Sequence, residues 1–274
     1  MTQPRSIALR YSAVCASCAT ALPGGTKAIW DRTARTVTCL DCANGTRPSQ
    51  EPRPLDRGEA GGSAGRRYQR LHERRETQAR ERWGRLSGLY LALTDEPQST
   101  RAWSTGSSGE RRLGAFLDGL SNERLTPLHD RRIPRSRANI DHLVVSAAGI
   151  FVVDAKHYGG KVRKVNRGGW FSTDYRLYVG RRDCTKLIAG MGKQVEAVSE
   201  AIGERVMQEF GLSVTPVLCF VAAEWSLFAR SFRLDGVWVE WPQSLAKRLL
   251  GPGRLAPEHV QGLASKLASE LPAA

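Results

Sequence analysis

Two short segments decide the fold of this chain. Residues 140–145 read IDHLVV and residues 149–156 read GIFVVDAK, and a Ser-Ala-Ala-Gly turn at 146–149 joins them. The composition predicts two apolar strands, and the short turn makes them antiparallel neighbours. A carboxylate without a partner inside such a strand costs several kcal/mol by rough order. The two strands nevertheless contain two such carboxylates, Asp141 and Asp154. A single cation bound by both carboxylates would explain their presence.

The second segment also places a lysine beside its acid. Asp154 and Lys156 are two residues apart, so on a strand they project from the same face. An acid and a cation side by side at the end of an apolar run are typical of metal-assisted phosphodiester hydrolysis.

Length and composition set the broad class. With 274 residues, 41% hydrophobic and 25% charged, the chain is long enough for one main globular domain and a smaller appendage. It contains no run near the roughly 18 apolar residues that span a membrane. The first residues, MTQPRS, lack the apolar core of a signal peptide. We therefore expect a cytoplasmic protein with no membrane partner.

The net charge of +14 is concentrated in two segments. Residues 66–85 hold eight Arg and three Glu, and residues 130–182 hold twelve Lys or Arg and four Asp. Clustered positive charge indicates a polyanionic partner, usually nucleic acid. The alternative is a general preference for Arg throughout the chain, without a binding role.

Four of the six cysteines form two C-x-x-C pairs, Cys15/Cys18 and Cys39/Cys42. Residues 1–45 have too few apolar side chains to fold on a core alone, and this spacing predicts a zinc ribbon with a structural Zn2+. Two disulfides or a redox pair are the alternative, against which a cytosolic location argues. We expect residues 27–30 and 35–38 to form the hairpin of the ribbon.

Three further regions follow the ribbon. Residues 46–65 are rich in Pro, Gly, Arg and Glu, which predicts a flexible linker. Residues 66–95 predict a basic helix with an apolar stripe near its end, formed by Trp83, Leu86, Tyr90 and Leu93. Its arginine-rich half suits either contact with DNA or simple solvation.

Residues 96–274 alternate between helix and strand. We expect a helix that begins at Ser108 and runs to about Leu120, then three strands, one long helix over 186–210 and a buried strand over 214–222, with another strand at 237–241. This order predicts an α/β domain with a mixed sheet.

Residues 109–223 resemble the NERD (nuclease-related) domain of the PD-(D/E)xK nuclease superfamily. The resemblance is carried by Gly109-Glu110, by the two segments quoted above and by Gln194-Val195. Fusion to a zinc ribbon is also similar to NERD-containing bacterial proteins. The resemblance implies a restriction-endonuclease-like mixed sheet flanked by helices. One departure is Asp154, where NERD domains often carry Glu.

The resemblance also implies roles for five residues. Asp141 and Asp154 would bind Mg2+, or Mn2+ in its place, and Glu110 would reach the ion from its helix. Lys156 would orient or help to deprotonate the attacking water and offset charge in the transition state. Gln194 would hold the lysine or the substrate strand.

Each residue also has a simpler interpretation. Glu110 could favour a helix N-terminus, and Gln194 could lie on the surface. The two aspartates could form buried ion pairs with Lys156 or with the arginines at 135 and 137. His142 and His157 alternate to the opposite faces of their strands, so we place both outside the site.

Three functions fit these features. The first is a Mg2+-dependent nuclease acting on DNA, with the zinc ribbon helping to hold nucleic acid. The second is a nucleic-acid-binding protein that retains the nuclease fold without catalysis, and the third is a zinc-dependent adaptor for a protein partner. The residues suit DNA or RNA and endo- or exonucleolytic cleavage alike, and they predict no oligomeric state.

Overall fold

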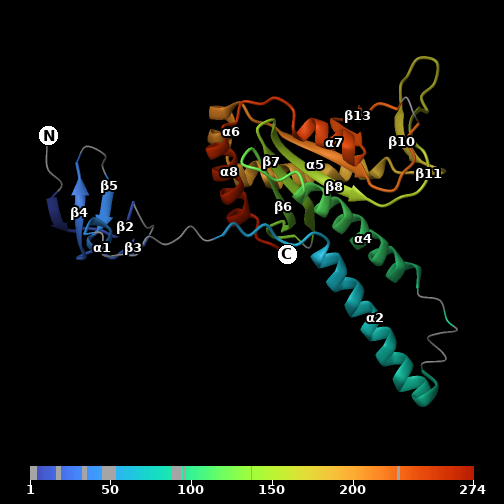
Figure 1. Cartoon of the computed structure of the whole chain (residues 1–274), viewed down its shortest axis with the longest axis horizontal. Coiled ribbons are helices and arrows are strands. Elements are labelled where there is room, and N and C mark those ends of the chain that lie inside the picture. Colours follow the sequence, from blue (N-terminus) through green and yellow to red (C-terminus); the bar gives the residue numbers. More distant parts are fainter. Residues whose placement is uncertain are drawn as a thin grey trace. The chain divides into compact units, whose positions relative to one another are not determined.

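The computed structural model describes residues 5–16, 20–32, 36–44, 54–87, 94, 97–136, 138–226 and 229–274. The chain divides into two compact units, Met1–Pro54 and Leu55–Ala274. Figure 1 shows both units, each of which is described below by itself. Among the described residues, no helix is long and apolar enough to cross a membrane.

The first unit is built of short strands. A three-stranded antiparallel sheet has the order β1-β4-β5, and β2 pairs with β3. The bounds are Arg5–Ala8 for β1, Ala13–Val14 for β2, Ala21–Leu22 for β3, Lys27–Asp31 for β4, Thr36–Cys39 for β5 and Leu40–Ala43 for helix α1. The predicted hairpin is confirmed as β4 and β5. The described core is small, with Leu9, Leu22 and Ala28 buried beside two cysteines.

The second unit contains a six-stranded mixed sheet of order β13-β14-β12-β8-β7-β6. Strands β6, β7 and β8 form an antiparallel meander, whereas β12 runs parallel to both β8 and β14. The bounds are Leu125–Arg132 for β6, Asn139–Ser146 for β7, Gly149–Lys156 for β8, Val214–Phe220 for β12, Phe232–Leu234 for β13 and Val237–Glu240 for β14. The predicted mixed sheet flanked by helices is confirmed.

Helices cover both faces of this sheet (Figure 1). Helices α4 (Gln98–Asp118) and α7 (Pro242–Leu249) pack on the face that carries Phe151, Val153 and Ala155. Helices α5 (Lys186–Ile202) and α8 (Pro257–Glu270) pack on the face that carries Ile150 and Val152. Alternation along β8 therefore assigns the side chains of Asp154 and Lys156 to the α5 face.

Two predicted helices differ from the observed ones. The helix expected at Ser108 begins ten residues earlier, at Gln98, and ends at Asp118. The single helix expected over 186–210 is two helices, α5 and α6 (Glu204–Phe210). Gly203 separates them at φ 84°, a conformation that a continuous helix excludes and that glycine adopts readily.

The segment before α4 belongs to the second unit. Gly58 lies close against His129 of β6, and the backbone N–H of His129 donates to the carbonyl of Arg57 at 2.6 Å. Helix α2 (Gly62–Trp83) begins inside the segment predicted as a linker, packs alongside α4 and is followed by a single 3-10 turn, η1 (Gly84–Leu86).

The apolar stripe predicted at the end of this basic helix is not buried in its described part. Trp83 is 44% exposed and Leu86 is 60% exposed. Gly84 ends α2 at φ 47°, which turns the chain out of the helical repeat on which the stripe depended. The other two members of the stripe, Tyr90 and Leu93, lie outside the described residues.

A second, three-stranded antiparallel sheet follows β8. Its order is β11-β10-β9, with bounds Val162–Asn166 for β9, Tyr175–Val179 for β10 and Arg182–Asp183 for β11. Figure 1 shows the β9–β10 connection projecting from the end of the main sheet at which β8 ends.

Candidate functional site

Asp141 and Asp154 lie opposite one another where β7 and β8 part. His142 pairs with Val153 at this end of the ladder, so the register places the two aspartates across from each other one residue further on. The ladder does not continue through them. Instead, Asp141 Oδ2 accepts the backbone N–H of Ala155 at 3.0 Å. The side chain of Asp141 thus fixes the fork between the two strands.

Lys156 contacts Asp154 on the same strand. Lys156 Nζ donates to Asp154 Oδ1, and the side chains are 20% and 13% exposed respectively. On its other side β8 pairs with β12, where Phe220 lies opposite Lys156. The lysine and the aspartate therefore lie at the end of a central strand of the sheet, and both side chains are largely shielded from water.

Glu110 approaches from α4, on the other face of the sheet. It lies twelve residues inside this helix, so the simpler interpretation as a helix N-terminal residue does not apply. Glu110 Oε2 is buried without a hydrogen-bond partner. Gly109 lets α4 come close, because a Cβ at this position would lie 2.8 Å from the Cβ of His157.

The electrostatics show that these groups form one cluster. Burial, reinforced by the charges of Asp130 and Asp154, raises the pKa of Glu110 to about 7, against the opposing charge of Lys156. Burial and the charges of Asp154 and Glu110 raise the pKa of Asp141 well above its ordinary value. Burial opposes protonation of Lys156, but the charges of Asp154 and Asp141 outweigh it and raise the lysine pKa.

The sequence missed a fourth acid, Asp130. It lies in β6 at φ 48°, and the register, which pairs His129 with His142 and Arg131 with Ile140, places it opposite Asp141. Its carboxylate accepts from the backbone N–H and the hydroxyl of Ser63, at 2.6 and 2.7 Å, and from Asn139 Nδ2. The charged pair Asp130-Arg131 stands near the end of β6, but the sequence does not reveal that both side chains are buried.

Gln194 lies on α5, which packs against β8 and β12. Its Oε1 is buried without a hydrogen-bond partner, which does not fit a residue on the open surface. A buried acceptor of this kind costs about 1–3 kcal/mol unless something donates to it. The amide is therefore available to a donor that binds from this face.

The two histidines that we placed outside the site have different surroundings. His142 Nδ1 lies 2.9 Å from His129 Nδ1, whose ring contacts Asp118 through Nε2 at 3.0 Å. This chain lies on the α4 side of the sheet, and burial lowers the pKa of His142 well below its ordinary value. His157 Nδ1 is buried without a partner, beside the helix that carries Glu110.

The alternative of arginine ion pairs has limited support. Arg135 lies in an exposed turn, and Arg137 lies outside the described residues. Within the described residues, the salt-bridge partner of Asp154 is Lys156, and Asp141 is held by a backbone N–H.

A second cluster lies in the first unit. The ligand atoms of Cys15, Cys39 and Cys42 all lie within 4.8 Å of one another, and Cys18 lies outside the described residues. The backbone N–H of Cys39 donates to Cys15 Sγ at 3.2 Å, and that of Cys42 donates to Cys39 Sγ at 3.4 Å. Tetrahedral zinc with Zn–S distances of about 2.3 Å brings its sulfurs about 3.8 Å apart, so the three thiols fit a metal such as zinc.

The carboxylate cluster also suits a divalent cation. Neighbouring carboxylates help to raise the pKa of Glu110 and of Asp141, and a cation would relieve that repulsion. Mg2+ needs only one or two protein carboxylates and keeps several waters. In the described structure, the oxygens of Glu110, Asp141 and Asp154 do not meet the 4.8 Å mutual spacing that the cysteines meet.

The fold and the site define an α/β protein with a mixed sheet that holds two carboxylates and a lysine at a fork between central strands, with a third carboxylate, Glu110, on helix α4. The profile of the NERD family, described as Nuclease-related domain, matches residues 105–221. The matched segment runs from the middle of α4 to the residue after β12, and it contains Glu110, Asp141, Asp154, Lys156 and Gln194. Comparisons with curated proteins and with solved structures gave no match.

Proposed function

We propose that this protein is a Mg2+-dependent nuclease that hydrolyses phosphodiester bonds of DNA. The observation that carries the proposal is the placement of Asp141, Asp154 and Lys156 at one fork of the sheet, inside the segment that matches the nuclease-related domain. Glu110 and Gln194 add two buried oxygens without partners. These are groups that a bound cation, its waters or a substrate would satisfy.

In this proposal Asp141, Asp154 and Glu110 hold the cation. Bound Mg2+ would polarise a phosphoryl oxygen and lower the pKa of a coordinated water. Mn2+ also accepts carboxylate oxygen ligands and is the natural substitute in an assay.

Lys156 acts as a cation rather than as a base, since its raised pKa keeps it protonated at neutral pH. Its ammonium group orients the attacking water and stabilises charge that develops on the phosphate. The pKa of Glu110 is about 7 in the metal-free protein, so this residue loses its proton near neutral pH when it binds the cation. Gln194 Oε1 accepts a hydrogen bond from the lysine or from a water near the substrate.

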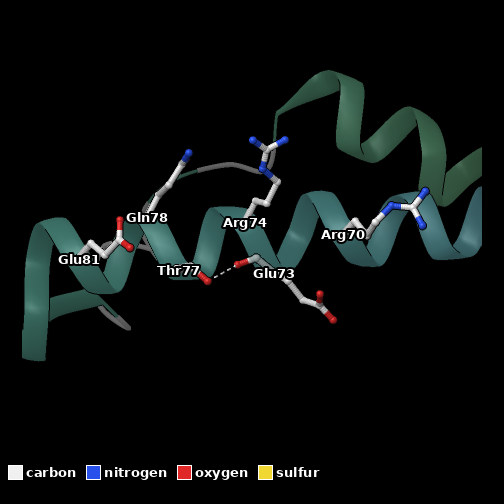
Figure 2. Close-up of a pocket in the computed structure, with 6 residues that line it drawn as sticks. All are labelled: Arg70, Glu73, Arg74, Thr77, Gln78 and Glu81. Atoms are coloured by element: carbon white, nitrogen blue, oxygen red, sulfur yellow. Dashed lines mark hydrogen bonds between the residues drawn. The ribbon is translucent and has the colours of Figure 1, made fainter.

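The basic surfaces hold the nucleic acid in this proposal. Along α2, Arg70 and Arg74 are one turn apart on one stripe, and Glu73 and Glu81 lie on a neighbouring stripe (Figure 2). The stripes border a hollow of about 430 Å3, lined by Arg70, Glu73, Arg74, Thr77, Gln78 and Glu81. Arginine contacts to phosphates carry no base information, so binding along this helix would show little sequence preference.

The first unit would assist binding as a zinc ribbon, with Cys15, Cys18, Cys39 and Cys42 as the four ligands. We retain the division into a ribbon (1–45), a connecting segment, a basic helix and a nuclease-related domain, and we propose that the protein works in the cytoplasm.

One observation favours a second function, nucleic-acid binding without catalysis. Lys156 occupies an oxygen of Asp154, and the three carboxylates are not gathered as closely as the cysteines. In that case the acids and the lysine would form an ion-pair network inside a retained fold.

A cleavage assay separates the two functions. Native protein, Asp154→Asn and Lys156→Ala are incubated with plasmid, linear and single-stranded DNA in Mg2+, Mn2+ or EDTA. Asp154→Asn should abolish metal-dependent cleavage with equal or higher DNA affinity, because a negative charge near the phosphates is removed. Lys156→Ala should lose about 10²-fold or more in rate, the scale for one preorganised electrostatic group.

Two exposed positions supply matched controls, Asp235→Asn in the β13–β14 turn and Lys266→Ala on α8. Both should cleave at the native rate. Equal, trace cleavage by the native protein and all variants under every metal would reject the nuclease and favour the binding function.

A further inference from the structure

Two aromatic side chains stand fully in water at the tip of the β9–β10 hairpin. The relative exposures of Trp170 and Phe171 are 100% and 103%, so both residues are fully accessible to solvent. Leaving such side chains in water forgoes about 1.5–3 kcal/mol each. Adjacent exposed aromatics at one tip mark a contact surface more often than scattered apolar residues do.

The turn that presents them is well ordered by hydrogen bonds. Asn166 Oδ1 accepts the backbone N–H groups of Gly168 and Asp174, both at 2.9 Å. Ser172 closes the tip, with its N–H 3.4 Å from the Gly169 carbonyl and its hydroxyl accepting the Gly169 N–H at 3.1 Å. Trp170 and Phe171 therefore occupy the two central positions of a closed turn.

Gly168 is required for this geometry. A Cβ at position 168 would lie 2.0 Å from the carbonyl oxygen of Ser172 and 2.8 Å from the backbone nitrogen of Asp174. The loop thus depends on a residue without a side chain, and the compact turn directs the aromatic pair outward.

The hairpin that carries the pair is strongly basic. Residues 161–182 contain seven Lys or Arg and one Asp. Several cations are held in place: Lys164 Nζ lies 4.3 Å from the ring centroid of Tyr175, and the Arg182 guanidinium lies 4.6 Å from that of Tyr158. Arg163 donates to the Gly180 carbonyl at 2.9 Å. A surface of ordered cations suits the phosphates of a polyanion.

The hairpin also continues directly from the candidate site. Strand β8 ends at Lys156 and β9 begins at Val162. The backbone N–H of Val162 donates to the carbonyl of Glu224 at 3.1 Å, which fixes the base of the hairpin to the segment after β12. Figure 1 shows the resulting projection at the end of the sheet where β8 ends.

We propose that Trp170 and Phe171 stack on unpaired bases of a single-stranded nucleic acid whose backbone lies along the cations of this hairpin. The proposal rests on the proposed function and names its substrate class. Bases in a duplex are already stacked, and inserting a side chain between them costs a few kcal/mol per step. Unpaired bases offer their faces freely, and alternating basic and aromatic groups are typical of single-strand binding surfaces.

An anionic membrane is the competing partner for a basic and aromatic tip. The tip offers it only two adjacent apolar side chains, followed by the polar Ser172 and Thr173. Stable anchoring takes a larger apolar face or a lipid in addition to charge. Nucleic acid is therefore the better match.

Binding measurements on the full chain test this proposal independently of cleavage. The double variant Trp170→Ala/Phe171→Ala is titrated against a labelled single-stranded oligonucleotide, the matching duplex and anionic phosphatidylserine vesicles, in EDTA. Single-strand affinity should fall at least about tenfold, from the stacking energy of about 1–3 kcal/mol per base. Its salt dependence should keep the native slope, because no charge is removed. Duplex affinity should change less than twofold.

Three further variants sharpen the result. The exchange variant Trp170→Phe/Phe171→Trp should keep native affinity, and Gly168→Ala should lose part of it while retaining both aromatics. Leu250→Ala, which removes an exposed leucine outside the hairpin, should bind as the native chain does. A 2-aminopurine placed in the single strand should be quenched by the native protein and not by the double variant.

The proposal is overturned if the double variant binds single strands as the native protein does, if duplex affinity falls equally, or if only vesicle binding depends on the aromatic pair. Native binding to single strands with an unchanged double variant would leave the proposed nuclease intact. Loss of single-strand binding in the double variant supports the proposal whether or not cleavage is observed.

Discussion

The two clusters of ligand-type side chains in this protein are supported in different ways. In the first unit, Cys15 follows strand β2, Cys39 ends β5 and Cys42 lies in α1. The buried residues that pack with Cys15 and Cys39 are Leu9, Leu22 and Ala28. Asp141, Asp154 and Lys156 lie on a six-stranded sheet with helices on both faces, and Glu110 lies on one of those helices, α4. In the first unit a metal would replace a core, whereas in the second the core holds the acids in place without one.

This difference separates two roles for a metal. A structural zinc contributes its binding energy directly to folding. A cation at the carboxylate fork would instead relieve repulsion among groups that the sheet has already brought together. Removing metal should therefore have a global effect on the first unit and a local effect on the second.

The largest expected effect is loss of the first unit on removal of zinc. Purified protein should contain about one Zn2+ per chain, bound with an apparent energy of about 10–16 kcal/mol at neutral pH. A strong chelator, or Cys39→Ser, should collapse the amide NMR signals of residues 5–44 into the unfolded range. The signals of the sheet should stay in place.

Cys184→Ala is the matched control, because this buried cysteine lies in the second unit and should leave the zinc content unchanged. A first unit that keeps dispersed signals without metal would remove the distinction between the two regions. Disulfides between the cysteine pairs in a reduced preparation would do so as well.

The second prediction tests the scaffold of the carboxylate site. Arg131 is fully buried next to Asp130, and it donates to the carbonyls of Leu271 at 2.6 Å, Ala268 at 2.7 Å and Asp56 at 3.0 Å. Arg131→Met should destabilise the second unit by about 3 kcal/mol, because unsatisfied carbonyls cost about 1–3 kcal/mol each. Urea unfolding followed by tryptophan fluorescence measures the change.

The neighbouring Arg132 is exposed, so Arg132→Met should change stability by no more than about 0.5 kcal/mol. The two substitutions remove the same charge one residue apart. Equal effects on stability would show that Arg131 is not the structural residue that its three carbonyl contacts indicate.

Arg131 also shows where prediction from sequence reached its limit. The charge count over 130–182 treats it as part of a polyanion-binding surface, although it is buried and ties β6 to the C-terminal helix and to Asp56. Composition records charge without exposure. Trp170 and Phe171 show the same limit for apolar residues. Their residue types suggest burial, but the turn between β9 and β10 exposes both side chains to water.

The strands of the site were predictable because their patterns are local. Alternation along β8 correctly placed Asp154 and Lys156 on one face, and the short turn correctly made β7 and β8 antiparallel. The contribution of Asp130 was not predictable in this way. Its positive φ and its bonds to Ser63, 67 residues earlier, depend on how α2 meets β6.

The smallest expected effect is also the most specific to the acid cluster. Since the pKa of Glu110 is raised from 4.5 to about 7, the folded protein binds this proton more tightly than the unfolded chain. The resulting stability is present in full below pH 4.5 and is lost as the pH rises to about 7. Glu110→Gln should therefore raise the free energy of unfolding of the metal-free protein at pH 8 by roughly 2 kcal/mol. It should also make that free energy less dependent on pH between 4.5 and about 7.

Mg2+ should reverse this trend, because binding requires ionised carboxylates and releases their protons. In the native chain, Mg2+ affinity should rise with pH up to about 7, by at most about tenfold per pH unit for each proton released. Glu110→Gln should bind Mg2+ more weakly with a shallower pH dependence, whereas the exposed Glu123→Gln should match the native protein. Calorimetry in two buffers of different ionisation enthalpy counts the protons directly. Identical proton release by the native and Glu110→Gln proteins would exclude Glu110 from the cation site.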